Sequence, residues 1–322
     1  MPSCPPILLI VFNRPQLATQ VLDAIRRQRP EKLYIAADGP REPATHPNDA
    51  ERCHDCRRLA ESIDWPCEVF TRFSEANQGC GRGPSNAISW FFEHESAGII
   101  LEDDCRPGDD FFLYCAELLA RYQDHPEVMH ICGNNFGSPE AAKACAGLSY
   151  GFGRYAQVWG WASCARAWRH FQYDVAPDVE NRAHFKVRGT DRLQQKVHQE
   201  RVRSTLGLRK HDVWDYQWQF AVLKNKGLTI CPSVNLISNL GFGEEATHTT
   251  KTNSPVAQAA TGRLAFPLIH PATIADSPAI NRLYADQMLG DAKRHRKKLY
   301  KSWLRRITGR APSRKSSPPN RL

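Results

Sequence analysis

The sequence predicts an α/β fold in which a mostly parallel open sheet carries helices on both faces. The first observation is a continuous apolar run at residues 6–12, which is typical of a strand buried on both faces. The second is the next such run, at residues 32–37, because helical periodicity fills the interval between them from residue 17 to residue 25. Strand, helix and strand in this order form a βαβ unit, which requires parallel strands.

The remaining elements follow in the same way along the chain. Asn13 is expected to cap the first helix, with Pro15 in its first turn, and Asp212 to cap a helix that runs through Leu223. The glycine-rich segment 77–84 is expected to form a loop. We expect further strands at residues 67–73, 98–102, 128–133 and 228–233, and helices at residues 49–63, 85–94, 110–122 and 177–210.

Length and composition limit the domain organisation. At 322 residues the chain can hold one large α/β domain with a smaller C-terminal part. No apolar run approaches the ~20 residues that span a bilayer, and residues 1–6 lack the basic start of a signal peptide, so we expect a cytoplasmic protein. The 11 cysteines are scattered and odd in number, which favours reduced structural thiols. Cys53 and Cys56 have CxxC spacing, but no second pair completes a zinc site.

The net charge of +9 comes from the C-terminal end. Twelve Lys and Arg and no acidic residue follow Asp291, so the rest of the chain is close to neutral. Residues 293–307 mix cations with aromatic and apolar side chains, as in a basic amphipathic helix that rests on an anionic membrane. The alternative is a solubilising tail without a partner. Nucleic-acid binding is not expected, because the body of the chain offers no matching basic patch.

Three adjacent acids, Glu102, Asp103 and Asp104, follow the apolar run at residues 98–101. Beside a core they repel one another and are costly to desolvate, unless a cation binds there. Mg²⁺ or Mn²⁺ takes one or two carboxylates together with phosphate oxygens and water. The alternative is a solvated acidic turn.

Other polar clusters also follow predicted strands, and in a parallel sheet these ends meet at the ligand-binding edge. Their convergence favours a nucleotide–metal site over an isolated acidic turn. The glycine spacing of segment 77–84 matches neither the dinucleotide fingerprint nor a Walker A sequence. The clusters contribute Asn13, Arg14, Asp38, Gly39 and Arg82.

The second half of the chain adds three candidates. Asp215 lies among aromatic residues, where a carboxylate tends to have a raised pKa and can act as a general base. Gly160, between Trp159 and Trp161, suits a backbone approached by a ligand beside an indole face, although these aromatics also suit a core. His248 follows a glycine turn and is a candidate for a metal or diphosphate contact, the alternative being a surface histidine.

Taken together, these motifs resemble the GT-A nucleotide-sugar glycosyltransferases. The closer resemblance is to the family of eukaryotic N-acetylglucosaminyltransferase I, whose pattern is also found in bacterial sugar-transferase or hemolytic-protein-like chains. It covers about residues 6–250. It is carried by Asn13-Arg14-Pro15, by Glu102-Asp103-Asp104 with Asp110-Phe111-Phe112 (the DxD motif), by Trp159-Gly160-Trp161, and by Trp214-Asp215-Tyr216-Gln217-Trp218.

The resemblance implies a nucleotide-diphospho-sugar transferase fold and a role for each motif. Asp104 would bind Mn²⁺ or Mg²⁺, with Glu102 and Asp103 facing the ribose and the sugar. Arg14 and Asp38 would position the nucleotide, Asp38 resembling an acid that contacts uracil. Asp215 would be the catalytic base, with Trp159, Gly160, Trp161 and Trp214 on the acceptor side. Two departures are Asn13, which replaces an acid, and Tyr216, which replaces a second acid after Asp215.

The activity implied is inverting transfer of a hexosyl or N-acetylhexosaminyl group from a nucleoside-diphosphate sugar, most simply a UDP-sugar, to an acceptor hydroxyl. A bacterial surface glycan or a lipid-linked oligosaccharide is the expected acceptor. The transferase domain would cover residues 1–270, with a nucleotide-binding half at 1–135 and an acceptor half at 136–270. Residues 271–322 would form a helical basic tail whose last dozen residues are disordered.

Two alternatives remain open. A sugar nucleotidyltransferase on a related fold would carry a glycine-rich lysine motif after the first strand, where this chain has Asn13-Arg14-Pro15. The other alternative is a non-catalytic protein that binds anionic surfaces through its tail.

Overall fold

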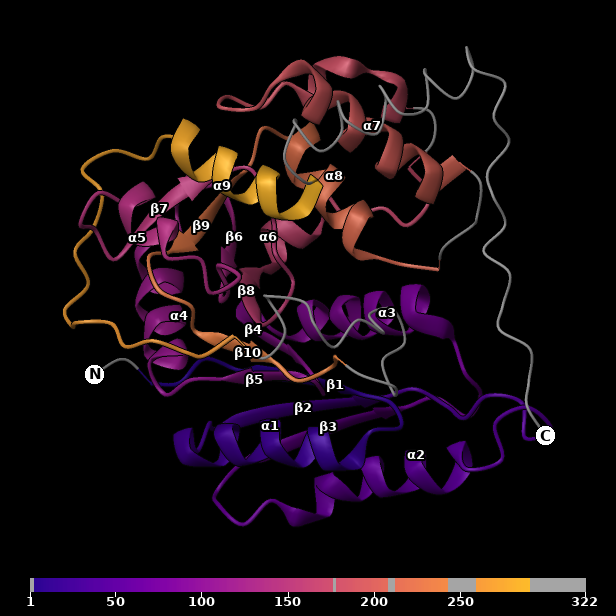
Figure 1. Cartoon of the computed structure of the whole chain (residues 1–322). Coiled ribbons are helices and arrows are strands. Elements are labelled where there is room, and N and C mark those ends of the chain that lie inside the picture. The colour runs from indigo at the N-terminus through magenta and orange to yellow at the C-terminus, as the bar shows by residue number, and fades with distance from the viewer. Residues whose placement is uncertain (1–2, 176–177, 208–211, 243–258, 290–322) are drawn as a thin grey trace, which may run out of the picture.

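A large mixed sheet forms the centre of the molecule, with helices on both faces (Figure 1). The computed structural model describes residues 3–175, 178–207, 212–242 and 259–289. The sheet has eight strands in the order β3-β2-β1-β4-β8-β6-β9-β7, and a separate antiparallel pair joins β10 to β5. The strands are β1 (Ile7–Val11), β2 (Lys32–Ala37), β3 (Glu68–Phe73), β4 (Ala97–Glu102), β5 (Cys105–Pro107), β6 (Val128–Cys132), β7 (Tyr150–Gly153), β8 (Trp161–Cys164), β9 (Leu228–Pro232) and β10 (Ile237–Asn239).

Strand directions confirm the predicted fold class. The strands β3, β2, β1 and β4 are parallel to one another, as are β6 and β9. Two strands run in the opposite direction: β8, which lies between β4 and β6, and β7 at the edge. The sheet is therefore mostly parallel, and its carboxyl ends gather along one edge.

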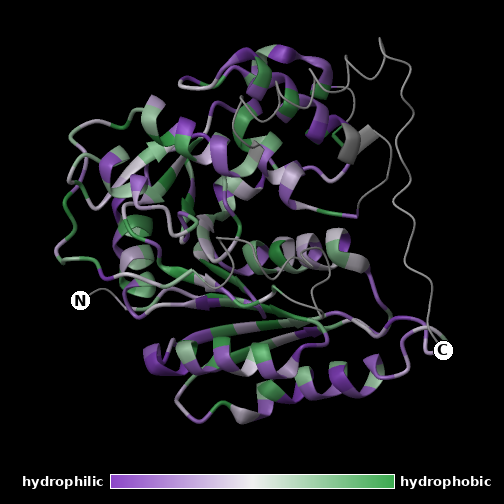
Figure 2. Ribbon diagram, in the orientation of Figure 1, coloured by the Kyte–Doolittle hydropathy of each residue, from purple (hydrophilic) through white to green (hydrophobic). Residues whose placement is uncertain are grey.

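Helices cover the sheet because alternate residues of β1 point to opposite faces. Ile7, Leu9 and Val11 pack with α1, α2 and α4, whereas Leu8 and Ile10 pack with α3, α6 and α8. Figure 2 shows hydrophobic residues concentrated in the strands and on one side of the flanking helices. The helices are α1 (Pro15–Gln28), α2 (Asp49–Arg58), α3 (Gly79–His94), α4 (Asp110–Arg121), α5 (Glu140–Ala144), α6 (Ala165–Trp168), α7 (Arg192–Gly207), α8 (Asp215–Lys224) and α9 (Pro278–Leu289), with 3₁₀ turns at Leu59–Ser62, Asp178–Glu180 and Arg182–Phe185.

The predicted helix caps are wrong at both positions. Helix α1 begins at Pro15 as expected, but its cap residue is Arg14 and no side chain caps it. The Asn13 amide donates instead to the Asp49 carboxylate at 2.8 Å, a partner that local sequence does not reveal. Helix α8 likewise begins after Trp214 without a side-chain cap, so Asp212 has another role.

The glycine-rich segment is not a loop. Helix α3 begins at Gly79, six residues before the expected start at Ser85, and includes Pro84. Glycine and proline weaken a helix interior, which is why the pattern predicted a loop. A Cβ at Gly79 or Gly81 would collide with the Asp212 carboxylate, so these positions are glycine because of tertiary contacts rather than because they form a loop.

The predicted boundary at residue 270 does not separate a tail from the body. Helix α9 buries Ile280, Tyr284 and Ala285 in the same cluster as Phe220 and Cys231. The Tyr284 hydroxyl also donates to the backbone oxygen of Asn134 at 2.8 Å. Residues 271–289 therefore belong to the core of the second half. The basic residues after Asp291 lie outside the described part of the chain, so their membrane contact stays a prediction.

Within the described ranges, none of the helices combines the length and the hydrophobicity that crossing a membrane requires.

Candidate active site

A cavity of about 790 Å³ opens at the carboxyl ends of β1, β2 and β4. This volume lies within the range of small-molecule sites, roughly 300–1,000 Å³. Both halves of the chain contribute to it, since the start of α8 closes it opposite the strand ends. Of the predicted site residues, Arg14, Asp38, Glu102, Asp103, Asp104, Trp159, Trp214 and Asp215 line it.

Other predicted site residues do not reach the cavity. Arg82 is exposed and lies over the ring of Tyr173, with its guanidinium carbon 4.2 Å from the ring centroid. Gly160 has a φ of +59°, and a Cβ there would lie 2.4 Å from Cδ1 of Ile237. Its backbone conformation and close packing, rather than a ligand, account for this glycine. The members of this group are Asn13, Gly39, Arg82, Gly160 and Trp161.

Trp161 is fully buried, which overturns its prediction as an acceptor contact. Its ring stacks on His130 with centroids 4.9 Å apart and packs against Trp214 and Trp218. It supports the cavity wall from behind. His248 falls outside the described residues, so its predicted metal contact is untested.

One arginine compensates the acid cluster. Arg14 forms an ion pair with Asp103 through Nη2, and its Nη1 lies 3.0 Å from Oδ2 of Asp104. Burial raises the pKa of Glu102 and of Asp103, and the neighbouring carboxylates raise it further, whereas Arg14 lowers it. Burial alone would lower the pKa of Arg14, but the acids raise it overall and keep it charged. Three acids thus share one paired arginine, and burial together with mutual repulsion raises the pKa of Glu102 and Asp103.

The acid cluster suits a cation whose coordination is completed by phosphate. Among the residues that the structure describes, no three His, Cys, Asp or Glu side chains are placed to hold a metal by themselves. Mg²⁺ in particular binds through one or two carboxylates plus phosphate oxygens. The Asp104 carboxylate lines the cavity beside Gly241, where a Cβ would lie only 2.1 Å from its Oδ2. Glycine at position 241 therefore leaves room for the Asp104 carboxylate.

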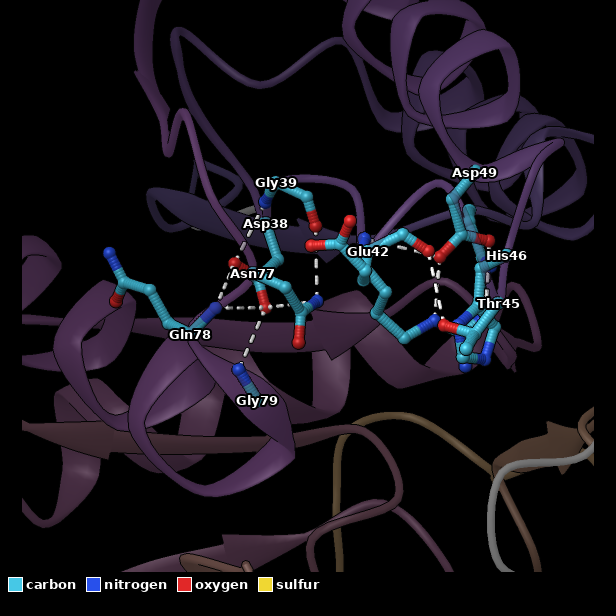
Figure 3. Close-up of polar contacts among 11 residues, drawn as sticks. Asp38, Gly39, Glu42, Thr45, His46, Asp49, Asn77, Gln78 and Gly79 are labelled. Atoms are coloured by element: carbon cyan, nitrogen blue, oxygen red, sulfur yellow. Dashed lines mark hydrogen bonds and ion pairs between the residues drawn. The ribbon is translucent and has the colours of Figure 1, made fainter.

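Asp38 is held by its own chain, as Figure 3 shows. Its carboxylate accepts hydrogen bonds from the backbone N–H groups of Gly39 at 2.8 Å, Gln78 at 2.8 Å and Gly79 at 3.2 Å. The Asn77 amide is a fourth donor at 3.1 Å. Burial raises the pKa of Asp38, and the backbone donors lower it. Asp38 thus binds the start of α3, and because it also lines the cavity, its predicted contact with a base stays a prediction.

Arg41 lines the cavity and was not predicted. Its Nε and Nη2 donate to the buried Asp49 carboxylate, which is labelled in Figure 3, at 2.6 and 3.0 Å. Its guanidinium carbon lies 5.3 Å from the Phe12 ring centroid. The Arg41 hydrogen bond lowers the pKa of Asp49 to about 2. The place of Arg41 in the cavity wall depends on its pairing with Asp49, and no local sequence motif indicates it.

Asp49→Asn is expected to lower thermal stability at neutral pH but not near pH 2. Because the native pKa of Asp49 is depressed, its ionised form stabilises the protein fully above the unfolded-state pKa of about 4, and this contribution is lost as the pH falls toward 2. Thermal midpoints measured across this range should converge for wild type and variant. Asp23→Asn is the control, because this half-exposed carboxylate pairs with Arg26 at the surface and contributes little at any pH. A gap that stays constant with pH would contradict the assignment.

The remaining wall of the cavity comes from the second half of the chain. Asp215 is the first residue of α8, and it raises the pKa of Glu102, which places the two carboxylates near each other. Trp159 packs edge-on against Phe242 with ring centroids 5.7 Å apart, and both line the cavity. Phe242 was not predicted, because only the pairing of β10 with β5 brings it here.

Comparison with known proteins identifies no family for this chain. No protein-family model matches the chain, and no curated protein sequence does either. Among solved structures, mouse xyloside xylosyltransferase 1 in its apo form matches with a TM-score of 0.36 and 11% sequence identity. The match covers 69% of this chain and 83% of that one. A likeness at this level assigns neither a family nor an activity.

Proposed function

We propose that the protein is a metal-dependent glycosyltransferase that uses a nucleoside-diphosphate sugar. The observation that carries this proposal is one cavity lined by the acid cluster with Arg14 on one side and by Asp215 on the other. A diphosphate is repelled by carboxylates unless a divalent cation lies between them. When bound, such a cation neutralises charge that develops on the leaving diphosphate.

The residues of the chain have distinct roles in this proposal. Asp104 holds the cation, and Arg14, fixed by Asp103, offers a permanent positive charge to the diphosphate. Asp215 accepts the proton of the acceptor hydroxyl while the oxygen of that hydroxyl attacks the anomeric carbon of the donor sugar. With Asp215 as a base and the acid cluster assigned to the cation, the proposed reaction inverts the configuration at the anomeric carbon. An α-linked product from an α-linked donor would contradict that part of the proposal.

The substrates are proposed at the level of chemical class. The donor is a hexose or N-acetylhexosamine linked to a nucleoside diphosphate, with UDP as the first candidate. Trp159 and Phe242 give the cavity an apolar aromatic wall, which suits the face of a sugar ring. The proposed acceptor is a hydroxyl of a surface glycan or of a lipid-linked oligosaccharide.

Nucleotide binding in the presence of manganese tests the proposal directly. UDP, GDP and CDP are compared by thermal shift, with and without Mn²⁺, for wild type and Asp104→Ala. We expect one nucleotide to raise the thermal midpoint only when Mn²⁺ is present, and Asp104→Ala to lose this shift because the ion loses its carboxylate.

Asp109→Ala is the matched control, since this exposed aspartate lies outside the cavity and pairs with Arg27 and Arg263. It should keep the nucleotide-dependent shift of the wild type. If no nucleotide stabilises the wild-type protein, the acid cluster is not a nucleotide–metal site.

A further inference from the structure

Three glycines at the start of α3 leave space for two carboxylates. A Cβ at Gly79 would lie 2.0 Å from Oδ2 of Asp212, and a Cβ at Gly81 would lie 2.2 Å from its Oδ1. A Cβ at Gly83 would lie 3.2 Å from Oδ2 of Asp38. Real Cβ atoms do not approach other atoms as closely as the first two distances. The glycine-rich segment therefore accommodates acids of the protein itself.

Asp212 lies against this first turn of α3 and is bonded both to it and to Tyr173. Its Oδ1 accepts a hydrogen bond of 2.7 Å from the Tyr173 hydroxyl, and the Cys80 thiol donates to its backbone oxygen. The Arg82 guanidinium covers the Tyr173 ring, which fixes the ring that holds Asp212. These contacts give Arg82 a role away from the cavity.

Asp212 itself lines the cavity, and the segment that follows it continues the cavity wall. Val213, Trp214 and Asp215 all line the cavity. Gln217 donates to the backbone oxygen of Val213 at 2.7 Å, which holds Val213 to the first turn of α8. The attachment of Asp212 to α3 thus fixes the place where α8 begins.

We infer that Asp212 is a positioning residue for Asp215, and that Gly79 and Gly81 are glycines because they receive its carboxylate. This inference rests on the proposed function, in which Asp215 is the base. Asp212 connects the start of α8 with α3, through the Cys80 thiol and the close approach of its carboxylate to Gly79 and Gly81, and with Tyr173. Displacement of a catalytic group by about 1 Å lowers turnover by as much as ~100-fold.

Asp212→Ala and Gly81→Ala test the inference from opposite sides of the contact. The first removes the carboxylate. The second adds a methyl group that displaces the carboxylate and would lie 2.9 Å from the Val213 backbone N. Because alanine is the better helix former, a loss of activity in Gly81→Ala would not come from a weaker helix. We expect both variants to lower kcat about 10- to 100-fold, and the Mn²⁺-dependent thermal shift with nucleotide to stay unchanged.

Asp212→Asn separates positioning from proton transfer. The asparagine oxygen still accepts from Tyr173 but cannot take a proton, so kcat should stay within about threefold of wild type. A loss as large as that of Asp212→Ala would overturn the inference and make Asp212 itself a proton acceptor. Gly147→Ala is the glycine control, because its φ is +83° but nothing lies within 4 Å of an added Cβ. Its kcat should equal that of wild type.

Hydrogen exchange gives a readout that needs no turnover. Amides of residues 213–218 should exchange faster in Asp212→Ala and Gly81→Ala than in wild type, and at the wild-type rate in Asp212→Asn. Unchanged exchange in the first two variants would refute the attachment. If the wild type transfers sugar from no donor, the proposed function fails while the exchange data still decide whether Asp212 anchors α8.

Discussion

Asp215→Asn is expected to lower turnover by about 10²–10⁴-fold while nucleotide binding stays intact, because a general base contributes this much to the rate. The side chain begins α8 and lines the cavity, whereas the helix behind it is anchored by Trp218 in the core. Asparagine has nearly the same shape, so the fold is retained and only the proton acceptor is lost. The measurements are kcat with the donor that the nucleotide screen selects, and the nucleotide-dependent thermal shift.

The matched control is Glu140→Gln. Glu140 lies in the first turn of α5, where it accepts a hydrogen bond from Ser138, and it is not part of the cavity. This control isolates the general effect of removing a carboxylate from a helix start. If Asp215→Asn keeps more than half of the wild-type kcat, another group accepts the proton.

The strands show which part of a fold local sequence determines. Continuous apolar runs predicted β1, β2, β4, β6 and β9 to within two residues, because a strand buried on both faces has no other pattern. The strands β7 and β8 have four residues each, and β7 contains two glycines, so neither forms a recognisable run. Their antiparallel direction depends on pairing with β9, β4 and β6, which are remote in sequence.

In the candidate site, too, local sequence predicted some residues, whereas contacts remote in sequence decide the others. Arg14 and Asp104 were predicted because both follow parallel strands that end at one edge of the sheet. The error at Asn13 concerns a side chain whose partner, Asp49, lies far along the chain. The contacts of Asp38 with residues 77–79 were likewise not predicted, although Asp38 does line the cavity. A residue type suggests what a side chain can bind, but remote contacts decide whether it is still available to a ligand.

Among the variants proposed, Trp161→Ala is expected to lower the free energy of unfolding most, by about 3–5 kcal/mol. Trp161 is fully buried, and its ring centroid lies 5.8 Å from that of Trp214 and 5.9 Å from that of Trp218. Burial lowers the pKa of the neighbouring His130 to about 3, so this core histidine stays neutral. Truncation leaves a large cavity among these rings. Urea unfolding measures the loss of unfolding free energy. Trp159→Ala is the control, because the Trp159 ring is half-buried and lines the cavity, so its truncation should lower the unfolding free energy far less.

Trp161→Phe separates packing from hydrogen bonding at the same position. Within the described residues the buried Trp161 Nε1 has no hydrogen-bond partner, and such a donor costs about 1–3 kcal/mol of desolvation. Phenylalanine keeps most of the ring contacts and removes this donor, so we expect a loss well below that of Trp161→Ala. A loss below 1 kcal/mol for Trp161→Ala would contradict the role of this ring as support for the cavity wall. Because Trp214 and Trp218 flank Asp215 in sequence and pack on Trp161, the same truncation should also lower kcat at temperatures where the variant remains folded.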